Sequence, residues 1–132
     1  ASFGAAVAVL DIREEAAAQV VSEIQTGGGQ ALAVRCDVTD YASVTAAVEQ
    51  VVAGIGSPDI LVNNAGIDVV RMFVDTDEAL WRRLTDVNYI GFLAMTHAVV
   101  PTMIEKKSGL MINVGSDAGR IGNPGDAVYC GT

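Results

Sequence analysis

The stretch PDILVNNAG, residues 58–66, joins an apolar run to two asparagines and a turn of small residues. Three more segments have the same form, an apolar run that leads to a polar residue: Ala5–Asp11, Ala31–Asp37 and Gly109–Ser116. In these runs apolar residues follow one another instead of alternating with polar ones. That pattern is typical of parallel strands that are buried on both faces of a sheet.

Longer stretches with helical spacing separate these strands. We expect helices over Arg13–Gln25, over Asp40–Ile55 with Thr39 or Asp40 as the N-cap, and over two successive parts of residues 77–107. Strands that alternate with helices predict crossover connections and a mainly parallel sheet. The predicted fold class is therefore α/β, a Rossmann-like doubly wound parallel sheet with helices on both faces. No linker divides residues 1–132, so we expect a single domain, a partial dinucleotide-binding one.

The composition is that of a folded globular domain. The chain has 132 residues, of which 51% are hydrophobic and 18% are charged, and its formal net charge is −8. This acidity argues against nucleic acid and anionic membranes as partners. The two cysteines, Cys36 and Cys130, lack the spacing of a metal site, so we expect no metal and a reducing, cytoplasmic location. The apolar stretch 89–104 is too short to cross a bilayer.

The glycines at positions 27–29 resemble a phosphate-binding loop, but their place in the chain argues against it. A phosphate loop follows a strand and opens a helix, whereas these glycines close a helix and precede a strand. Asp11, in contrast, stands at the tip of the first strand, where a dinucleotide fold keeps an acidic residue about 20 residues beyond its glycine loop. We therefore expect a first strand and its glycine loop to be missing, and residues 1–5 to be the tail of a helix.

Several features, in this order, resemble the short-chain dehydrogenase/reductase family. They are Asp11, the sequence CDV at 36–38, the sequence NNAG at 63–66, Asn88, and Ser116 followed thirteen residues later by Tyr129. The resemblance covers the whole chain as the middle portion of a family member, with the first strand and the C-terminal part absent. In the doubly wound order, the missing strand would lie between the first and third strands seen here and leave a gap of about 9.6 Å.

The resemblance implies an oxidoreductase that interconverts a secondary alcohol and a ketone with a nicotinamide cofactor. It assigns cofactor contacts to Asp11, Asp37, Val38, Asn63, Ala65 and Gly66. Asp11 would bind the ribose, Asp37 the adenine amine, and the small residues of the NNAG turn would let the backbone approach the cofactor. A carboxylate at Asp11 repels a 2′-phosphate, so NAD is expected and NADP less so, although Arg13 softens this repulsion.

By the same resemblance three residues are catalytic. Asn88 would hold a relay water, Ser116 would bond the substrate oxygen, and Tyr129 would be the general acid/base. A phenol can exchange a proton with the ketone oxygen, a serine hydroxyl can polarise the carbonyl, and the nicotinamide supplies the hydride chemistry. The family pattern places a lysine four residues after this tyrosine, just beyond Thr132, where its charge favours the phenolate. We therefore expect these 132 residues to be inactive alone.

The loop GSDAGRIGNPGDAVY, residues 115–129, is most similar to dehydrogenases of cyclic or β-hydroxyacyl-CoA substrates, with 3-oxoacyl reductases as close neighbours. A small ketone or alcohol is the expected substrate. The predicted helix Tyr89–Lys106 is apolar nearly all round, so we expect a homo-oligomer, a tetramer, in which another subunit covers it and His97 packs or lies at the interface. An inactive Rossmann-like binding or scaffold module without the lysine is the alternative. A flavodoxin-like or phosphate-receiver domain would not explain NNAG.

Overall fold

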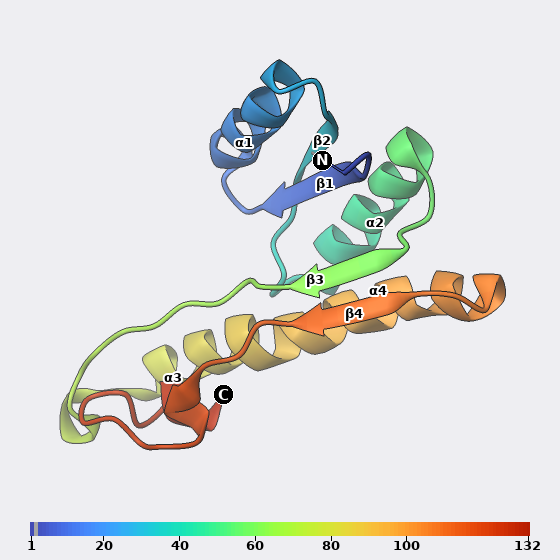
Figure 1. Ribbon diagram of the computed structural model, residues 1–132. Helices are drawn as coiled ribbons and strands as arrows, with labels where there is room; N and C mark the ends of the chain where they lie inside the picture. Colours follow the sequence, from blue (N-terminus) through green and yellow to red (C-terminus); the bar gives the residue numbers. More distant parts are fainter. Residues whose placement is uncertain (2) are drawn as a thin grey trace.

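The computed structural model describes residue 1 and residues 3–132. The helix tail expected over residues 1–5 is wrong for residues 3–5, which form a turn and a bend before β1, and Ser2 lies outside the described residues. The strands and α-helices alternate along the chain (Figure 1): β1 (Ala6–Asp11), α1 (Glu14–Thr26), β2 (Gln30–Arg35), α2 (Tyr41–Ile55), β3 (Ile60–Asn63), α3 (Glu78–Thr85), α4 (Gly91–Lys106) and β4 (Leu110–Asn113). Four shorter segments complete the order: the 3-10 helices η1 (Phe73–Asp75), η3 (Asp117–Gly119) and η4 (Tyr129–Gly131), and the π-helical η2 (Asp86–Ile90).

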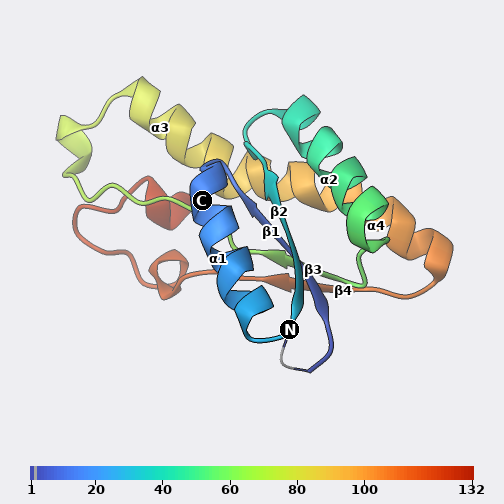
Figure 2. The ribbon, with the colours of Figure 1, turned by 90° about the horizontal axis from the view of Figure 1, so that it is seen from above.

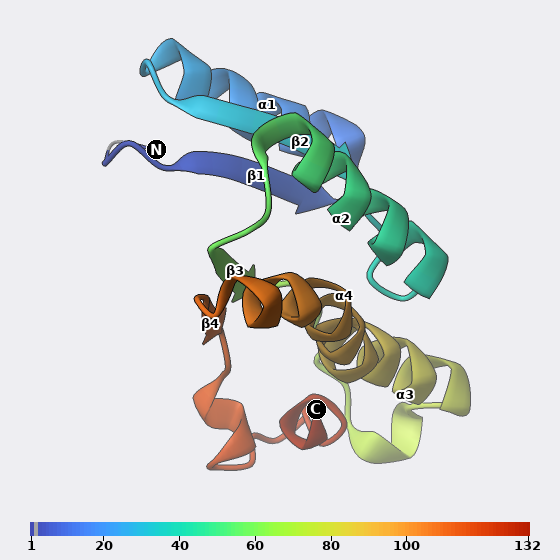
Figure 3. The ribbon, with the colours of Figure 1, turned by 90° about the vertical axis from the view of Figure 1, so that its right-hand side faces the viewer.

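The strands are parallel, as predicted, but they form two separate pairs. β1 pairs with β2 from Ala6↔Gln30 onward, and β3 pairs with β4 from Ile60↔Leu110 onward. Within the described residues no ladder joins β1 to β3. Figure 3 shows the two pairs lying apart, with β1 and β2 on one side and β3 and β4 on the other. The split falls where the sequence predicts a missing strand.

Helices cover the two pairs unequally. α1 lies on one side of the strands, and α2 and α4 lie on the other (Figure 2). The pair β1–β2 is therefore covered on both faces, whereas α4 covers the β3–β4 pair on one face. The opposite face of that pair exposes Ile60, Val62, Leu110 and Ile112, which are 44–55% accessible. Because buried parallel sheets need cover on both faces, this apolar surface fits the expectation of an incomplete fold.

The core consists of two apolar clusters that meet at α2. Val44, Ala47 and Val51 of α2 pack with Val34 and Cys36 in one cluster. Val48 of the same helix joins a second cluster with Leu61, Val99 and Met103. Fully burying a Val, Leu or Met side chain contributes roughly 1.5–3 kcal/mol. The helix α2 thus belongs to the packing of both strand pairs.

The ends of the first two helices follow the sequence-based expectations. Asp40 is the N-cap of α2, and its Oδ1 accepts a hydrogen bond of 3.0 Å from the Ala42 amide. At the end of α1, Gly28 has a φ of +80°, and the Gly29 amide donates to the Ile24 carbonyl at 2.9 Å. This left-handed glycine with its back-bond is a Schellman ending, so the glycines form a C-cap.

The helices α3, η2 and α4 run on as one helical stretch, residues 78–106. By length and composition alone this stretch could cross a membrane: its most apolar 18-residue window has a mean hydropathy of 1.3, and 17% of that window is buried. The core helix of a folded domain passes the same test, and α4 packs against β3 and α2. Leu93 and Ile104 of α4 remain 42% and 68% exposed, so much of its apolar surface has no cover within this chain.

Candidate active site

A cleft of about 1420 Å³ lies between the two strand pairs. It runs the length of β1 and β3 in the gap between them, and at their carboxyl ends it is also lined by the segments that follow β2 and β3. The residues that line it include Asp11, Asp37, Val38, Asn63, Ala65, Gly66 and Asn88. All six residues predicted to contact the cofactor and one predicted catalytic residue therefore share one cleft. In open α/β sheets ligands bind at this end of the strands.

Asp11 ends β1 and is held by its own turn. The Arg13 amide donates to Asp11 Oδ1 at 2.8 Å, and Arg13 Nε lies 3.7 Å from the same oxygen. The Asp11 side chain is 37% exposed and that of Arg13 is 75% exposed. The carboxylate is thereby fixed in direction and stays accessible from the cleft. Arg13 places a positive charge next to it, which reduces its repulsion of an anionic ligand.

Asp37 follows β2 and is also held by a local turn. Its Oδ1 accepts hydrogen bonds from the Thr39 hydroxyl at 2.7 Å and the Thr39 amide at 3.0 Å. These bonds, hydroxyl first, hold the pKa of Asp37 below its ordinary value, with Arg35 adding a smaller electrostatic effect. The carboxylate is therefore charged at neutral pH. Before it, burial and the nearby Asp37 raise the pKa of the Cys36 thiol.

Val38 lies where the start of α4 approaches the turn after β2. A Cβ at Gly91 would lie 2.7 Å from Val38 Cγ2, closer than real Cβ contacts. Gly91 is therefore the residue that allows this approach, because any larger side chain would push the turn away. Gly91 could not be recognised from the sequence, because its role depends on a neighbour 53 positions earlier in the chain.

Asn63 ends β3, and its amide is bonded within the protein. Its Nδ2 donates to Asn113 Oδ1 at 3.0 Å and to Thr96 Oγ1 at 3.2 Å. These contacts join the ends of β3 and β4 to α4, so they set the position of the NNAG turn. Sequence reasoning missed Asn113 and Thr96. The available signal was the pair of asparagines at equivalent places in two successive strands.

Asn88 lies in the π-helical segment η2, which the sequence did not predict. Its Oδ1 accepts from the Ile67 amide at 2.8 Å, and its Nδ2 donates to the Ile67 carbonyl at 2.9 Å. The side chain thus pairs with a backbone residue in both directions and fixes the loop after the NNAG turn. Nδ2 also donates to Thr132 Oγ1 at 3.0 Å. Short π-helical segments often occur at functional sites because they redirect side chains and free carbonyls.

Ser116 and Tyr129 lie on the neighbouring segments η3 and η4. Ser116 caps η3, where its Oγ accepts from the Ala118 amide at 3.2 Å. Tyr129 begins η4 and lines a small cavity with Arg71 and Leu84. The Thr132 hydroxyl donates to the Tyr129 carbonyl at 3.0 Å and accepts from Asn88, so a short chain of hydrogen bonds links η4 to Asn88.

The structure thus brings together the segments that carry the three predicted catalytic residues. Asn88 lines the large cleft and Tyr129 the small cavity, and Ser116 borders neither. No hydrogen bond joins the side chains of these three residues in the part of the chain that the structure describes. Their catalytic roles remain predictions. Residue 1 and residues 3–132 contain no cluster of three or more His, Cys, Asp and Glu side chains that could hold a metal ion.

The whole chain, residues 1–132, matches the family model of the short chain dehydrogenases. It is 39% identical over 127 residues to 2-(S)-hydroxypropyl-CoM dehydrogenase 3 of Xanthobacter autotrophicus. The aligned region makes up 96% of this chain and 50% of that relative. It is 37% identical over 119 residues to the 3-oxoacyl-(acyl-carrier-protein) reductase FabG of Staphylococcus aureus, with 90% and 48% covered. The crystal structure of a gluconate 5-dehydrogenase from Burkholderia cenocepacia, in complex with NADP and tartrate, superposes with a TM-score of 0.92 at 34% identity, with 99% and 51% covered.

The chain therefore belongs to the short-chain dehydrogenase family, as its motifs predicted. Its α/β architecture is that of this family's nucleotide-binding fold. The chain spans about half the length of the curated relatives it matches.

Proposed function

We propose that this chain is part of a nicotinamide-dependent oxidoreductase that interconverts a secondary alcohol and a ketone. The observation that carries the proposal is that Asp11, Asp37, the NNAG turn and Asn88 line one cleft, in its part next to the carboxyl ends of the strands, in a chain of this family. The names of the two relatives, a hydroxypropyl dehydrogenase and a 3-oxoacyl reductase, describe the same alcohol–ketone chemistry. A cyclic or β-hydroxyacyl thioester substrate is proposed from the loop before Tyr129.

The residues of the cleft fit part of a dinucleotide. Asp11 offers a carboxylate to a ribose hydroxyl and Asp37 offers one to an amine, whereas the chain holds no glycine loop for the phosphates. When bound, the cofactor gives or takes the hydride. We place Tyr129 as the group that exchanges a proton with the substrate oxygen. Ser116 Oγ accepts from the Ala118 amide, so its own proton is free to be donated to that oxygen. Asn88 holds the loop at Ile67 and the turn at Thr132 in place.

We propose NAD(H) as the preferred cofactor because the Asp11 carboxylate accepts from a 2′-hydroxyl and repels a 2′-phosphate. Arg13 beside it reduces this discrimination, and one structural neighbour holds NADP. Dissociation constants for NADH and NADPH, measured on the full-length protein, test the assignment. NADH is expected to bind more tightly, and Asp11→Asn should narrow the difference. Tighter binding of NADPH would contradict the role given to Asp11.

We further propose a cytoplasmic homo-oligomer, a tetramer, in which a second subunit covers α4. The exposed apolar side chains of α4, with Ile104 at 68% and Tyr89 of the preceding segment at 49%, support this proposal. Sedimentation of the full-length protein should give the mass of an oligomer, and Ile104→Glu should shift it toward smaller species. Lys107→Glu at the polar end of the helix is the matched control. A monomer in the wild type would contradict the proposal.

The activity is tested by following NADH oxidation with cyclic ketones and acyl-thioester ketones. Tyr129→Phe keeps the ring and removes the proton donor, so it should abolish reduction and leave NADH binding within a few-fold of wild type. Normal turnover by Tyr129→Phe would remove the acid/base assignment. A full-length protein that binds NADH but turns over none of these ketones would favour the inactive binding module.

A further inference from the structure

We propose that Asp126 binds a second hydroxyl group of the substrate, one or two carbons from the carbon that reacts. This inference rests on the proposed function. Its starting point is the oxygen Oδ1 of Asp126, which is buried and has no hydrogen-bond partner among the described residues. A buried polar atom without a partner is uncommon in a folded protein and calls for an explanation. A carboxylate oxygen needs a donor, because an ionised carboxylate can only accept.

The position of Asp126 connects it to the proposed chemistry. It lies three residues before Tyr129, and the Cys130 amide donates to the Asp126 carbonyl at 2.8 Å, which closes a helical turn. Residues three apart on such a turn point to the same side. Asp126 and Tyr129 accordingly line one small cavity of about 10 Å³. That volume is about the room of a single water-sized group.

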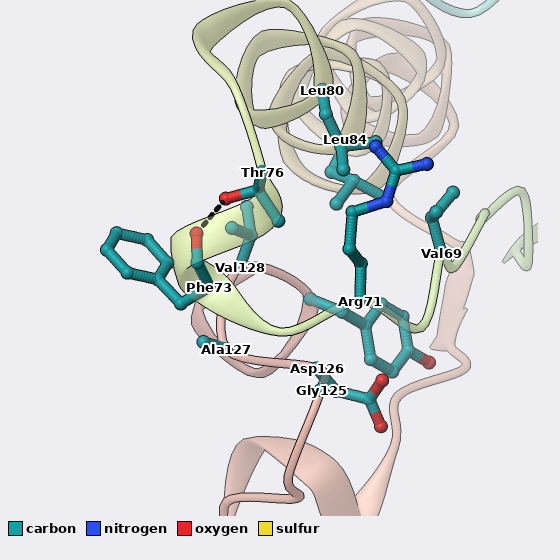
Figure 4. Close-up of a pocket in the computed structure, with 11 residues that line it drawn as sticks. Val69, Arg71, Phe73, Thr76, Leu80, Leu84, Gly125, Asp126, Ala127 and Val128 are labelled. Atoms are coloured by element: carbon teal, nitrogen blue, oxygen red, sulfur yellow. Dashed lines mark hydrogen bonds between the residues drawn. The ribbon is translucent and has the colours of Figure 1, made fainter.

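The residues that line this cavity donate no hydrogen bond to Asp126 Oδ1. They include the apolar side chains of Val69, Leu80 and Leu84. Arg71 also lines the cavity, but no ion pair joins it to Asp126 in the described part of the chain. Figure 4 shows the Arg71 side chain extending toward Leu84 and away from the Asp126 carboxylate. A polar atom that enters here meets the carboxylate of Asp126, with the hydroxyl-bearing side chains of Thr76 and Tyr129 in the same wall.

Helix capping does not account for the carboxylate either. Two other aspartates that precede helices in this chain, Asp40 and Asp77, accept hydrogen bonds from backbone amides at 3.0 Å and 2.8 Å. Asp126 lies two residues before Val128, the N-cap of η4, and no backbone amide donates to its Oδ1. Asp126 Oδ1 therefore has no hydrogen-bond donor among the described residues.

A hydroxyl group near the reacting carbon is the donor that fits. It is as small as the cavity requires, it donates one hydrogen bond, and it would enter beside Tyr129 while the reacting oxygen meets the phenol. A substrate that lacks this hydroxyl leaves Asp126 unpaired, and sites built to bond a hydroxyl discriminate strongly against such analogues. The substrate class is therefore an alcohol with a second hydroxyl, a 1,2- or 1,3-diol or the corresponding hydroxyketone.

The test compares kcat/KM of the full-length protein for cyclohexanol with that for cyclohexane-1,2-diol and cyclohexane-1,3-diol. Wild type should prefer one of the diols. Asp126→Leu should reduce the diol-to-alcohol ratio by about 10- to 100-fold, the loss expected for one hydrogen bond to a charged group. Asp126→Asn keeps an acceptor oxygen and should retain part of the preference. Asp68→Leu, at an exposed aspartate outside the cavity, is the matched control and should leave the ratio unchanged.

The same variants separate the possible failures. A purely structural Asp126 would lower the unfolding temperature in Asp126→Leu and leave the diol-to-alcohol ratio as in wild type, which would overturn the inference. If no alcohol is oxidised with either cofactor, the proposed function fails. Calorimetric titration with the diols then measures whether Asp126 contributes to diol binding, independently of any activity. Diol binding that weakens about 10-fold or more in Asp126→Leu but not in Asp68→Leu supports the inference, and equal binding by both overturns it.

Discussion

Replacing Asn88 with alanine should loosen the loop that follows the NNAG turn. The side chain makes hydrogen bonds of 2.8 Å and 2.9 Å with the Ile67 backbone and one of 3.0 Å with Thr132. A net contribution of about 1 kcal/mol applies to each of the two Ile67 bonds. The variant should therefore lose about 2 kcal/mol of unfolding free energy. With a urea m-value of about 2 kcal/mol/M, the midpoint should fall by about 1 M.

Urea unfolding at neutral pH measures this loss, and Asn123→Ala is the control. Asn123 is exposed, and its side chain makes no hydrogen bond within the described residues. Hydrogen exchange of the Ile67 amide gives a local reading, because this amide should exchange faster in Asn88→Ala than in the control. A midpoint for Asn88→Ala within about 0.2 M of the control, together with unchanged Ile67 exchange, would refute the reasoning.

Three further outcomes are expected from burial and titration. Iodoacetamide should modify Cys130 well before Cys36, as peptide mapping can show, because Cys36 is 3% exposed and its raised pKa leaves less thiolate at neutral pH. Thr39→Val removes a donor to Asp37, so the NMR-titrated pKa of Asp37 should rise toward its ordinary 3.8. Because the folded-state pKa of Asp37 is lowered, its contribution to stability is present above about pH 4 and is lost as the pH falls through the folded value, and Thr39→Val should reduce that acid-dependent loss. Val44→Ala, at a fully buried position, should cost about 2 kcal/mol in urea unfolding, whereas a loss below about 0.5 kcal/mol would contradict its place in the core.

The regular elements could be predicted from the sequence because their signals are local. The apolar runs before Asp11 and Asn63 marked strands, and Asp40 marked the start of a helix. The π-helical segment around Asn88 could not be predicted, since its residues have the same helical spacing as those of α3 and α4 on either side. Its geometry depends on the pairing of the Asn88 amide with Ile67, a contact across 21 positions of the chain.

The candidate site was predictable to the extent that it lies at strand ends. Asp11, Asp37 and the NNAG turn come together because parallel strands present their carboxyl ends at one edge. The partners that hold them could not be read in the same manner. Thr96 is an ordinary helix residue until β3 is laid against α4, and Asp126 is an ordinary loop residue until the absence of a donor to its oxygen is seen.

The two clusters that share α2 have a mechanical consequence. Val44 and Val48 lie one turn apart on this helix. The cluster of Val44 includes β2 and that of Val48 includes β3, and α4 contacts both clusters through Met95 and Ala98. We therefore expect a small tilt of α2 over α4 to shift the two strand pairs relative to each other. Such a shift would change the width of the cleft between the two strand pairs. We therefore expect substitutions where α2 packs against α4 to alter ligand affinity although their side chains do not contact the ligand.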